Sequence, residues 1–422
     1  MNIIEIIEKK KNKEILTNEE IEYVIENFLN GNIKDYQMSS LLMAICINGM
    51  EKDEIFNLTK AMLDSGDKID LSEIKGTKVD KHSSGGIGDK TTLVLLPIVA
   101  SLGVNVAKMS GRGLGFTGGT IDKLESIDGF EVEKSREDFL KQVEEIGIAL
   151  VSQSGNLVPA DKKIYALRDV SGTVESTALI ASSIMSKKLA SGADAIVLDV
   201  KVGKGALMKN VESARKLGKT MKEIGEAFGK KMSIFLTNME EPLGYAVGNG
   251  LEVKEAIDTL KGNGPKDLEY LCFKLASQMV SFGLSIPVEE AEEKVKEVLK
   301  NGKAYQKFEE WITYQGGDIN KIEISSNYQE IRSSKEGFIT NIDALKIGYL
   351  VKDLGAGRNK KEDEIDYGVG VVIHKKVGEY IKQGESLLTI YYNKEYKEED
   401  FINCFIISDK QKEKNKLIYE IM

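Results

Sequence analysis

Cysteine and histidine are both scarce in this chain of 422 residues. The three cysteines, Cys46, Cys272 and Cys404, are odd in number and far apart, so they predict neither a disulfide framework nor a metal site. This usage fits a reducing compartment, and we expect the protein to be cytoplasmic. The chain has only two histidines, His82 and His374, and His82 lies in a glycine-rich segment.

Long apolar runs and an excess of positive charge are also missing. No stretch approaches the ~20 apolar residues that a membrane-spanning helix needs, and the first residues carry early acids and no apolar signal core. The net charge of −9 argues against nucleic acid or an anionic membrane as the main partner. An anionic substrate would then need a local cluster of cations.

The patterns along the chain indicate three regions. Residues 1–66 and 159–191 favour helices, which we expect to form one all-α lobe. Residues 74–158 and 192–330 contain buried-strand patterns and two strand–glycine loop–helix units, which are typical of an α/β lobe with a central sheet. Residues 331–422 show glycine-punctuated short strands, which predict a small C-terminal α+β domain. The expected fold class is α/β with α+β.

The most informative segment is residues 80–92, with the sequence DKHSSGGIGDKTT. Its glycines let the backbone approach a ligand closely, and its amides, hydroxyls and lysine are groups that hold phosphate. Its imidazole can move a proton near neutral pH. A second glycine-rich loop, residues 110–120, follows an expected strand at 104–109. These groups together predict chemistry beside a bound phosphate. Neither loop has Walker A spacing or a complete dinucleotide fingerprint, so binding of a nicotinamide dinucleotide is only weakly supported.

A second group of polar residues lies in the later helical segment. Ser183 and Lys187 are four residues apart, so a helix places them on one face, and Arg168 ends the helix before. Lys188 points roughly 100° away from Lys187, and we expect it at the surface. His374 has no acid or second histidine nearby in sequence, and we interpret it as structural.

These segments together resemble the thymidine and pyrimidine-nucleoside phosphorylase family, and most closely its pyrimidine-nucleoside branch. The motifs that carry the resemblance are 81–89 (KHSSGGIGD), 110–115 (SGRGLG), 117–125 (TGGTIDKLE), 160–169 (ADKKIYALRD), 186–188 (SKK), 199–203 (DVKVG) and 354–358 (LGAGR). The resemblance implies a homodimer formed through the α lobe. It also implies phosphorolysis of pyrimidine nucleosides (uridine, thymidine, deoxyuridine) to the free base and a pentose 1-phosphate.

The resemblance also implies the residues of the site. Phosphate would contact Lys81, Ser83, Thr92, Lys108, Ser110 and Thr120. The base would contact His82, Tyr165, Arg168, Ser183 and Lys187, of which His82, Arg168 and Lys187 would be catalytic. The chemistry needs no cofactor, and a structural potassium ion would be held by Gly88, Leu243, Ala246 and Glu255. Three departures stand out: Ser84 replaces a threonine and keeps the hydroxyl, Phe116 replaces a histidine, and Lys90, whose ammonium would compete with that ion, replaces a hydroxyl residue.

Three other functions remain open from the sequence. A thymidine phosphorylase restricted to deoxyribosides would share every motif above. A phosphoribosyltransferase of the anthranilate type would share the architecture but would need magnesium and acidic ligands for its diphosphate. A non-catalytic nucleoside-binding protein would keep the fold without the reaction, although the intact set of His82, Lys81, Arg168 and Lys187 argues against it.

Overall fold

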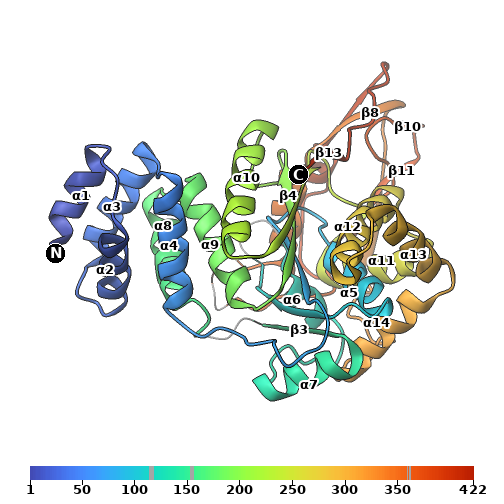
Figure 1. The fold of residues 1–422 in the computed structure, drawn as a ribbon. Coiled ribbons are helices and arrows are strands. Elements are labelled where there is room, and N and C mark those ends of the chain that lie inside the picture. The colour runs from blue at the N-terminus through green and yellow to red at the C-terminus, as the bar shows by residue number, and fades with distance from the viewer. Residues whose placement is uncertain (114–117, 153–155, 359, 361–362) are drawn as a thin grey trace. The chain divides into compact units, whose positions relative to one another are not determined.

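The computed structural model describes residues 1–422 except 114–117, 153–155, 359 and 361–362, and it divides into two compact units (Figure 1). The helical unit comprises residues 1–73, 153–196 and 215–232, and the second unit comprises residues 74–152, 197–214 and 233–422. The two predicted helical segments therefore fall in one unit. Residues 215–232 also join that unit, and residues 331–422 cluster with the α/β part of the second one.

The described residues of the helical unit form helices joined by short segments. The helices are α1 (Ile3–Lys11), α2 (Asn18–Leu29), α3 (Asp35–Asn48), α4 (Lys52–Asp64), α8 (Pro159–Ser171), α9 (Thr177–Ala190) and most of α10 (Val211–Ala227). A capping box begins α2, because the Thr17 hydroxyl accepts from the Glu20 amide and the Glu20 carboxylate accepts from the Thr17 amide. Helix α4 packs against α9 and α2, so the N-terminal helices and the later pair share one core.

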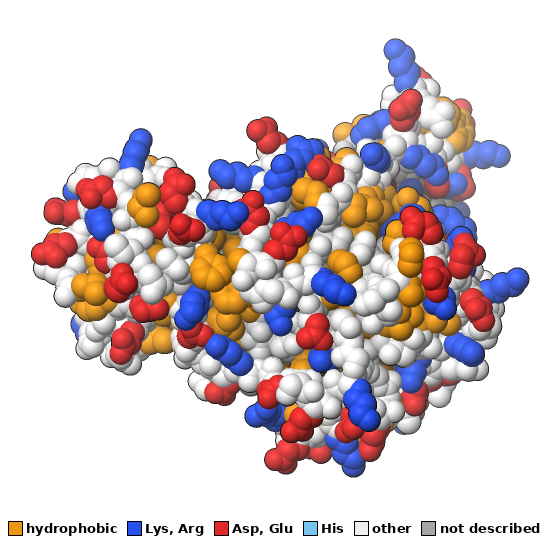
Figure 2. Space-filling model, in the orientation of Figure 1, with side chains coloured by type: hydrophobic (Ala, Val, Ile, Leu, Met, Phe, Trp, Pro, Cys, Tyr) orange, Lys and Arg blue, Asp and Glu red, His pale blue; other side chains and the backbone are white. Residues whose placement is uncertain are grey.

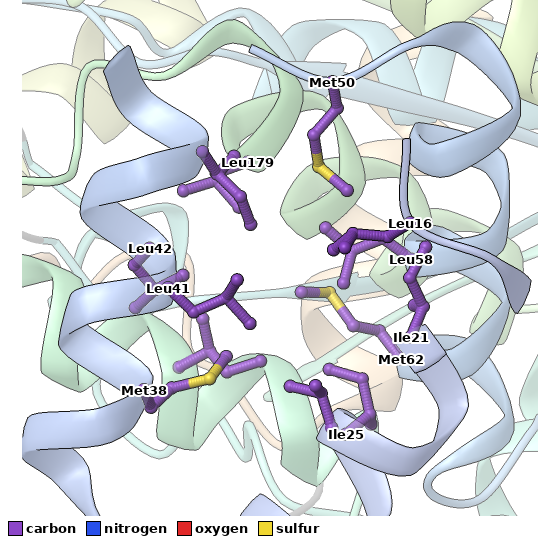
Figure 3. A pocket seen from close by; sticks show the side chains of 13 residues that line it. Leu16, Ile21, Ile25, Met38, Leu41, Leu42, Met50, Leu58, Met62 and Leu179 are labelled. Carbon is purple, nitrogen blue, oxygen red and sulfur yellow. The ribbon is translucent and has the colours of Figure 1, made fainter. Parts of the chain in front are cut away.

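Hydrophobic side chains alone line the small cavity at the centre of this bundle (Figure 3). Leu41 and Met38 of α3 face Met62 and Leu58 of α4 across it, and Leu179 of α9 closes one side. Burial of such side chains is worth about 1.5–3 kcal/mol each. With no polar lining atom, the cavity belongs to the core that holds α8 and α9 in place.

The second unit begins as an α/β structure. Its elements up to residue 314 are β1 (Val79–Ser83), α5 (Thr91–Ser101), β2 (Val106–Ser110), α6 (Thr120–Glu125), α7 (Arg136–Ile146), β3 (Ile148–Ser152), β4 (Ala195–Val202), β5 (Lys231–Asn238), β6 (Ala246–Val247), α11 (Asn249–Leu260), α12 (Lys266–Leu284), α13 (Val288–Lys300) and α14 (Lys303–Tyr314). One sheet has the order β1-β4-β5-β13, and β2 pairs with β3 in parallel.

The two glycine-rich loops leave the same edge of this structure. A parallel bridge joins Lys78 to Asn105, just before β1 and β2, so these strands run in the same direction. Their carboxyl ends, at Ser83 and Ser110, therefore lie on one side, which is where ligands bind in sheets of this kind.

The C-terminal region adds two small antiparallel sheets. Its elements are β7 (Tyr328–Arg332), β8 (Gly337–Ile342), α15 (Ala344–Val351), the π-helix η1 (Lys352–Ala356), β9 (Gly370–Ile373), β10 (Tyr380–Ile381), β11 (Ser386–Tyr391), α16 (Glu398–Ile402), β12 (Phe405–Ser408) and β13 (Ile418–Ile421). Strand β9 pairs with β6, and β13 pairs with β5, so this region is tied to the α/β core at two points. His374 lies here and its ring bonds the Thr389 hydroxyl at 2.8 Å.

Charges of both signs are interspersed on the visible face of both units (Figure 2). Within the described residues, no single helix is long and apolar enough to cross a membrane. Helices α12 and α13 together meet the same length and composition criterion, but they are bent by 115° where they meet.

Candidate active site

The first glycine loop joins β1 to α5, and a buried lysine lies behind it. Lys81 on β1 is 0% exposed, and its ammonium donates to the Thr91 hydroxyl at 2.5 Å. The carboxylates of Asp89 and Asp199 lie 4.0 and 3.9 Å from the same nitrogen. Asp199 also lies 2.6 Å from the buried ammonium of Lys201. Two cations and two carboxylates thus form a buried network under the loop.

Asp89 connects this network to the loop itself. Its carboxylate accepts hydrogen bonds from the Ser83 hydroxyl and from the amide and hydroxyl of Thr91, the latter at 2.6 Å. Burial opposes its ionisation, but the charges of Lys81 and Lys201 outweigh burial and hold the pKa of Asp89 well below its usual range. Asp89 is therefore a fixed anion that orients the hydroxyls of the loop.

We expect Asp89→Asn to lower the stability by about 3 kcal/mol at neutral pH, because it leaves the buried Lys81 and Lys201 with one carboxylate instead of two. A carboxylate whose folded pKa is depressed stabilises the fold above its unfolded pKa of about 3.9, and this stabilisation is lost as pH falls through the folded pKa. The gap in thermal unfolding midpoint between wild type and variant should be constant from about pH 5 to 8 and shrink in stronger acid.

The exposed Asp409→Asn provides the matched control, and we expect no such gap for it. A gap for Asp89→Asn that stayed the same size at about pH 3 would show that the carboxylate's charge is not what stabilises the loop.

The end of β2 lies against β1 and carries the second loop. Lys108 donates to the Asp80 carboxylate at 3.2 Å and to the main-chain carbonyl of Lys81, and Ser110 ends the strand two residues later. The second loop is held by Asp122 of α6, whose carboxylate accepts from the Gly113 amide at 2.6 Å. Arg358 from the C-terminal region donates to the same carboxylate at 2.9 Å. Phe116 and its neighbours 114–117 lie outside the described residues.

The six predicted phosphate ligands all lie in the second unit, but they differ in exposure. The hydroxyl residues Ser83, Ser110 and Thr120 are half-buried and lie at the two loops. Thr92, Lys81 and Lys108 are buried, and both lysine ammoniums are bonded to other residues of β1 and its loop. Direct contact of each with phosphate stays a prediction.

The predicted base-binding residues of the helical unit are brought together by α8 and α9. Arg168 is almost fully buried, and its guanidinium donates to the carbonyls of Thr173, Val174 and Leu179 at 3.1, 2.7 and 3.2 Å. Burial lowers the pKa of Arg168 and the charge of Asp161 opposes that shift. Arg168 therefore fixes the segment between the two helices and places a cation beside them.

Lys187 forms the second cation of this group. Its ammonium donates to the Asp161 carboxylate at 2.8 Å and to the Ser183 hydroxyl at 3.1 Å. The Tyr165 ring lies 5.7 Å from both the Lys187 nitrogen and the Arg168 guanidinium carbon, and burial raises the pKa of its phenol. The side chain of Lys187 is 25% exposed, so one cation with fixed partners faces solvent beside an aromatic ring.

Lys188, the neighbour of Lys187, does not lie at the surface. It is buried with 3% exposure, because α9 is buried on nearly every face, so the expectation of a surface position was wrong. His82, the fifth predicted base contact, lies on β1 in the second unit and is half-buried.

The predicted potassium ligands do not fit an ion in this structure. Leu243, Ala246 and Glu255 each accept a hydrogen bond from the Lys90 ammonium, and the carbonyl of Gly88 accepts from the Lys90 amide at 3.0 Å. The side chain of Lys90 thus takes the position expected for the ion.

Sequence reasoning assigned no role to Asp89, Asp122, Asp199 or Lys201. A signal for the last two was present, since Asp199 and Lys201 interrupt a strand pattern that is otherwise apolar and all eight residues of β4 are buried. Charged residues inside a buried strand need partners, so they point to a network of charges.

Comparisons with known proteins cover nearly the whole chain. Residues 4–66 match the family model described as glycosyl transferase family, helical bundle domain, residues 75–305 match glycosyl transferase family, a/b domain, and residues 338–406 match pyrimidine nucleoside phosphorylase C-terminal domain. Pyrimidine-nucleoside phosphorylases of Staphylococcus haemolyticus, Geobacillus stearothermophilus and Bacillus subtilis are 55, 54 and 53% identical, each over 94% of this chain and 93% of the relative.

A solved structure shares the architecture at lower identity. Anthranilate phosphoribosyltransferase of Thermus thermophilus is similar with a TM-score of 0.58 and 20% identity, covering 73% of this chain and 98% of that chain. At this identity the likeness shows the fold alone. With the matched domains, it confirms the predicted fold class of a helical part, a large α/β part with a central sheet and a small C-terminal part.

Proposed function

The chain belongs to the pyrimidine-nucleoside phosphorylase family, and on this premise we propose that it catalyses the reversible phosphorolysis of pyrimidine nucleosides. The products are the free base and ribose or deoxyribose 1-phosphate. The observation that carries the proposal is the 53–55% identity to enzymes of that name over 94% of the chain. Two groups of residues, which we call half-sites, support the proposal. The phosphate half-site, on the two glycine loops, is rich in phosphate-binding groups, and the base half-site, on α8 and α9, offers paired cations beside an aromatic ring.

The phosphate half-site lies on the two glycine loops of the second unit. The hydroxyls of Ser110 and Thr120 donate to phosphate oxygens, and each such hydrogen bond to a charged group is worth about 1.5–3 kcal/mol. The Ser83 hydroxyl donates to Asp89 in this structure and contacts phosphate only if it gives up that bond. The first turn of α5, which contains Thr92, adds the positive end of a helix. Lys81 and Lys108 supply positive charge from behind the loops.

The base half-site lies on α8 and α9. Cleavage of the glycosidic bond places positive charge on the sugar and negative charge on the departing pyrimidine. Arg168 and Lys187 stabilise that negative charge where it develops, which is the form of catalysis that preorganised charges supply best. Tyr165 and Ser183 position the base, and His82 donates a proton to a base oxygen, since an imidazole titrates near neutral pH. Phosphate oxygen attacks the anomeric carbon as the glycosidic bond breaks, which forms the pentose 1-phosphate.

Uridine, deoxyuridine and thymidine are the substrates that test this proposal. We expect release of the free base from all three, only when phosphate is present, with measurable kcat/KM for the riboside. Activity confined to the two deoxyribosides would instead indicate a restricted thymidine phosphorylase.

An anthranilate-type transferase remains the alternative of the same fold. Base release that requires neither magnesium nor phosphoribosyl diphosphate would exclude it. Failure to release base from any of the three nucleosides with phosphate would contradict the proposed function and favour a non-catalytic nucleoside-binding protein.

We also propose that the protein is a homodimer formed through its helical unit. Three apolar side chains of α3, Tyr36, Met43 and Ile47, are exposed, the first and last by 73 and 74%. Their spacing of seven and four residues places them on one helix face. A mass of two chains in sedimentation analysis would support this arrangement.

A cytoplasmic location is proposed from the three cysteines, none of which forms a disulfide.

A further inference from the structure

The side chain of Lys90 enters a cage of oxygen atoms in the second unit. Lys90 is completely buried, and its ammonium donates to the carbonyls of Leu243 and Ala246 at 3.1 and 2.7 Å and to the Glu255 carboxylate at 2.5 Å. An ammonium has three donors, and all three are matched here. One carboxylate balances the one positive charge, so the cage is complete in both hydrogen bonds and charge.

The oxygens of the cage are positioned by other contacts. The second oxygen of Glu255 accepts from the amides of Tyr245 and Ala246 at 2.8 and 3.0 Å, and the Leu243 amide donates to the Ile87 carbonyl at 3.0 Å. Gly88 has a φ of +72°, and a Cβ at this position would lie 2.5 Å from the Leu243 carbonyl oxygen. The loop at 241–247 therefore packs directly on the first glycine loop, with Lys90 between them.

A second lysine binds the other carbonyls of the same loop. Lys376 donates to the Pro242 and Gly244 carbonyls, the latter at 3.1 Å, and forms an ion pair of 3.0 Å with Asp267. Burial opposes its charge, but Asp267 and Glu241 hold the pKa of Lys376 above its normal value. The loop is therefore organised by tethered ammonium groups on both sides.

We propose that Lys90 is a built-in replacement for a bound monovalent cation, so that this chain needs no potassium to fix its phosphate loop. Carbonyl oxygens with one carboxylate are ligands for a dehydrated monovalent ion, and the ammonium satisfies the same oxygens. A tethered cation is present at any salt concentration, whereas a free ion binds by mass action. The structure assigns Lys90 as a positioning residue, because it acts through Gly88 and the loop that follows β1.

The wild-type protein and Lys90→Thr test this inference directly. Thermal unfolding is measured after exhaustive dialysis, in potassium chloride and in tetramethylammonium chloride of equal ionic strength. We expect the wild-type midpoint to be the same in both salts and its potassium content by atomic absorption to be negligible. Lys90→Thr should unfold several degrees lower in tetramethylammonium and recover in potassium with a saturable dependence on concentration, because the hydroxyl frees the cage for the ion.

Lys254→Thr is the matched control, because Lys254 is exposed on α11 beside Glu255, and we expect no effect of potassium on it. Potassium retained by the wild-type protein at one ion per chain, or a folded Lys90→Thr that does not respond to potassium, would overturn the inference. If Lys90→Thr does not fold in either salt, the wild-type potassium content still decides. Neither measurement uses enzymatic activity, so the outcome is independent of the proposed function.

Discussion

Replacing Lys187 with alanine is expected to lower kcat/KM for phosphorolysis by about 10²–10³-fold, the cost of losing a preorganised group that stabilises developing charge. Lys187 is held by Asp161 and Ser183, so its ammonium needs no reorganisation when the pyrimidine becomes negative. Because that charge appears only as the glycosidic bond breaks, kcat should fall more than KM for the nucleoside rises. Steady-state kinetics with uridine at saturating phosphate measure both quantities.

The adjacent Lys188 is unsuitable as a control, because it is buried and its loss would disturb the fold. Lys162 is exposed on α8, and Lys162→Ala should leave kcat/KM and the unfolding midpoint nearly unchanged. Lys187→Ala should keep a far-ultraviolet circular dichroism spectrum like that of the wild type. Equal losses of activity in Lys187→Ala and Lys162→Ala would remove Lys187 from the proposed mechanism.

The parts of this site that sequence predicted are those governed by local geometry. Ser183 and Lys187 are one helical turn apart, and the predicted shared face appears as a hydrogen bond of 3.1 Å. The strand–glycine loop–helix units are also local, because Gly88 at positive φ follows from a turn that only glycine adopts easily. Such features depend on a few neighbouring residues, so the sequence contains them directly.

The parts that sequence did not predict depend on distant segments. The cage around Lys90 joins residues more than 150 positions apart. Only the family resemblance named its oxygens and the competing Lys90, because no local pattern links such distant residues. The surface position predicted for Lys188 requires a solvent-facing side of α9, whereas Ala178 to Ala190 are mostly buried. Only tertiary packing decides how many faces of a helix are covered.

The double variant Ser110→Ala with Thr120→Val is expected to raise KM for phosphate by about 10²–10⁴-fold. Each change removes one hydroxyl donor to a charged oxygen, worth about 1.5–3 kcal/mol, and the expected range corresponds to the sum of the two losses. KM for the nucleoside should change little, because the base half-site is built from other residues. Isothermal titration with inorganic phosphate measures the loss without turnover.

The hydroxyls of Ser110 and Thr120 are better targets for this test than Lys81, because the Lys81 ammonium balances buried carboxylates. Removing Lys81 would take away one of the two cations that balance the buried Asp89 and Asp199, and the resulting instability would obscure any effect on phosphate. Ser101→Ala is the matched control, since its hydroxyl only caps the end of α5 by bonding the Ile98 carbonyl. Phosphate affinity that survived in the double variant would place the anion away from the second glycine loop.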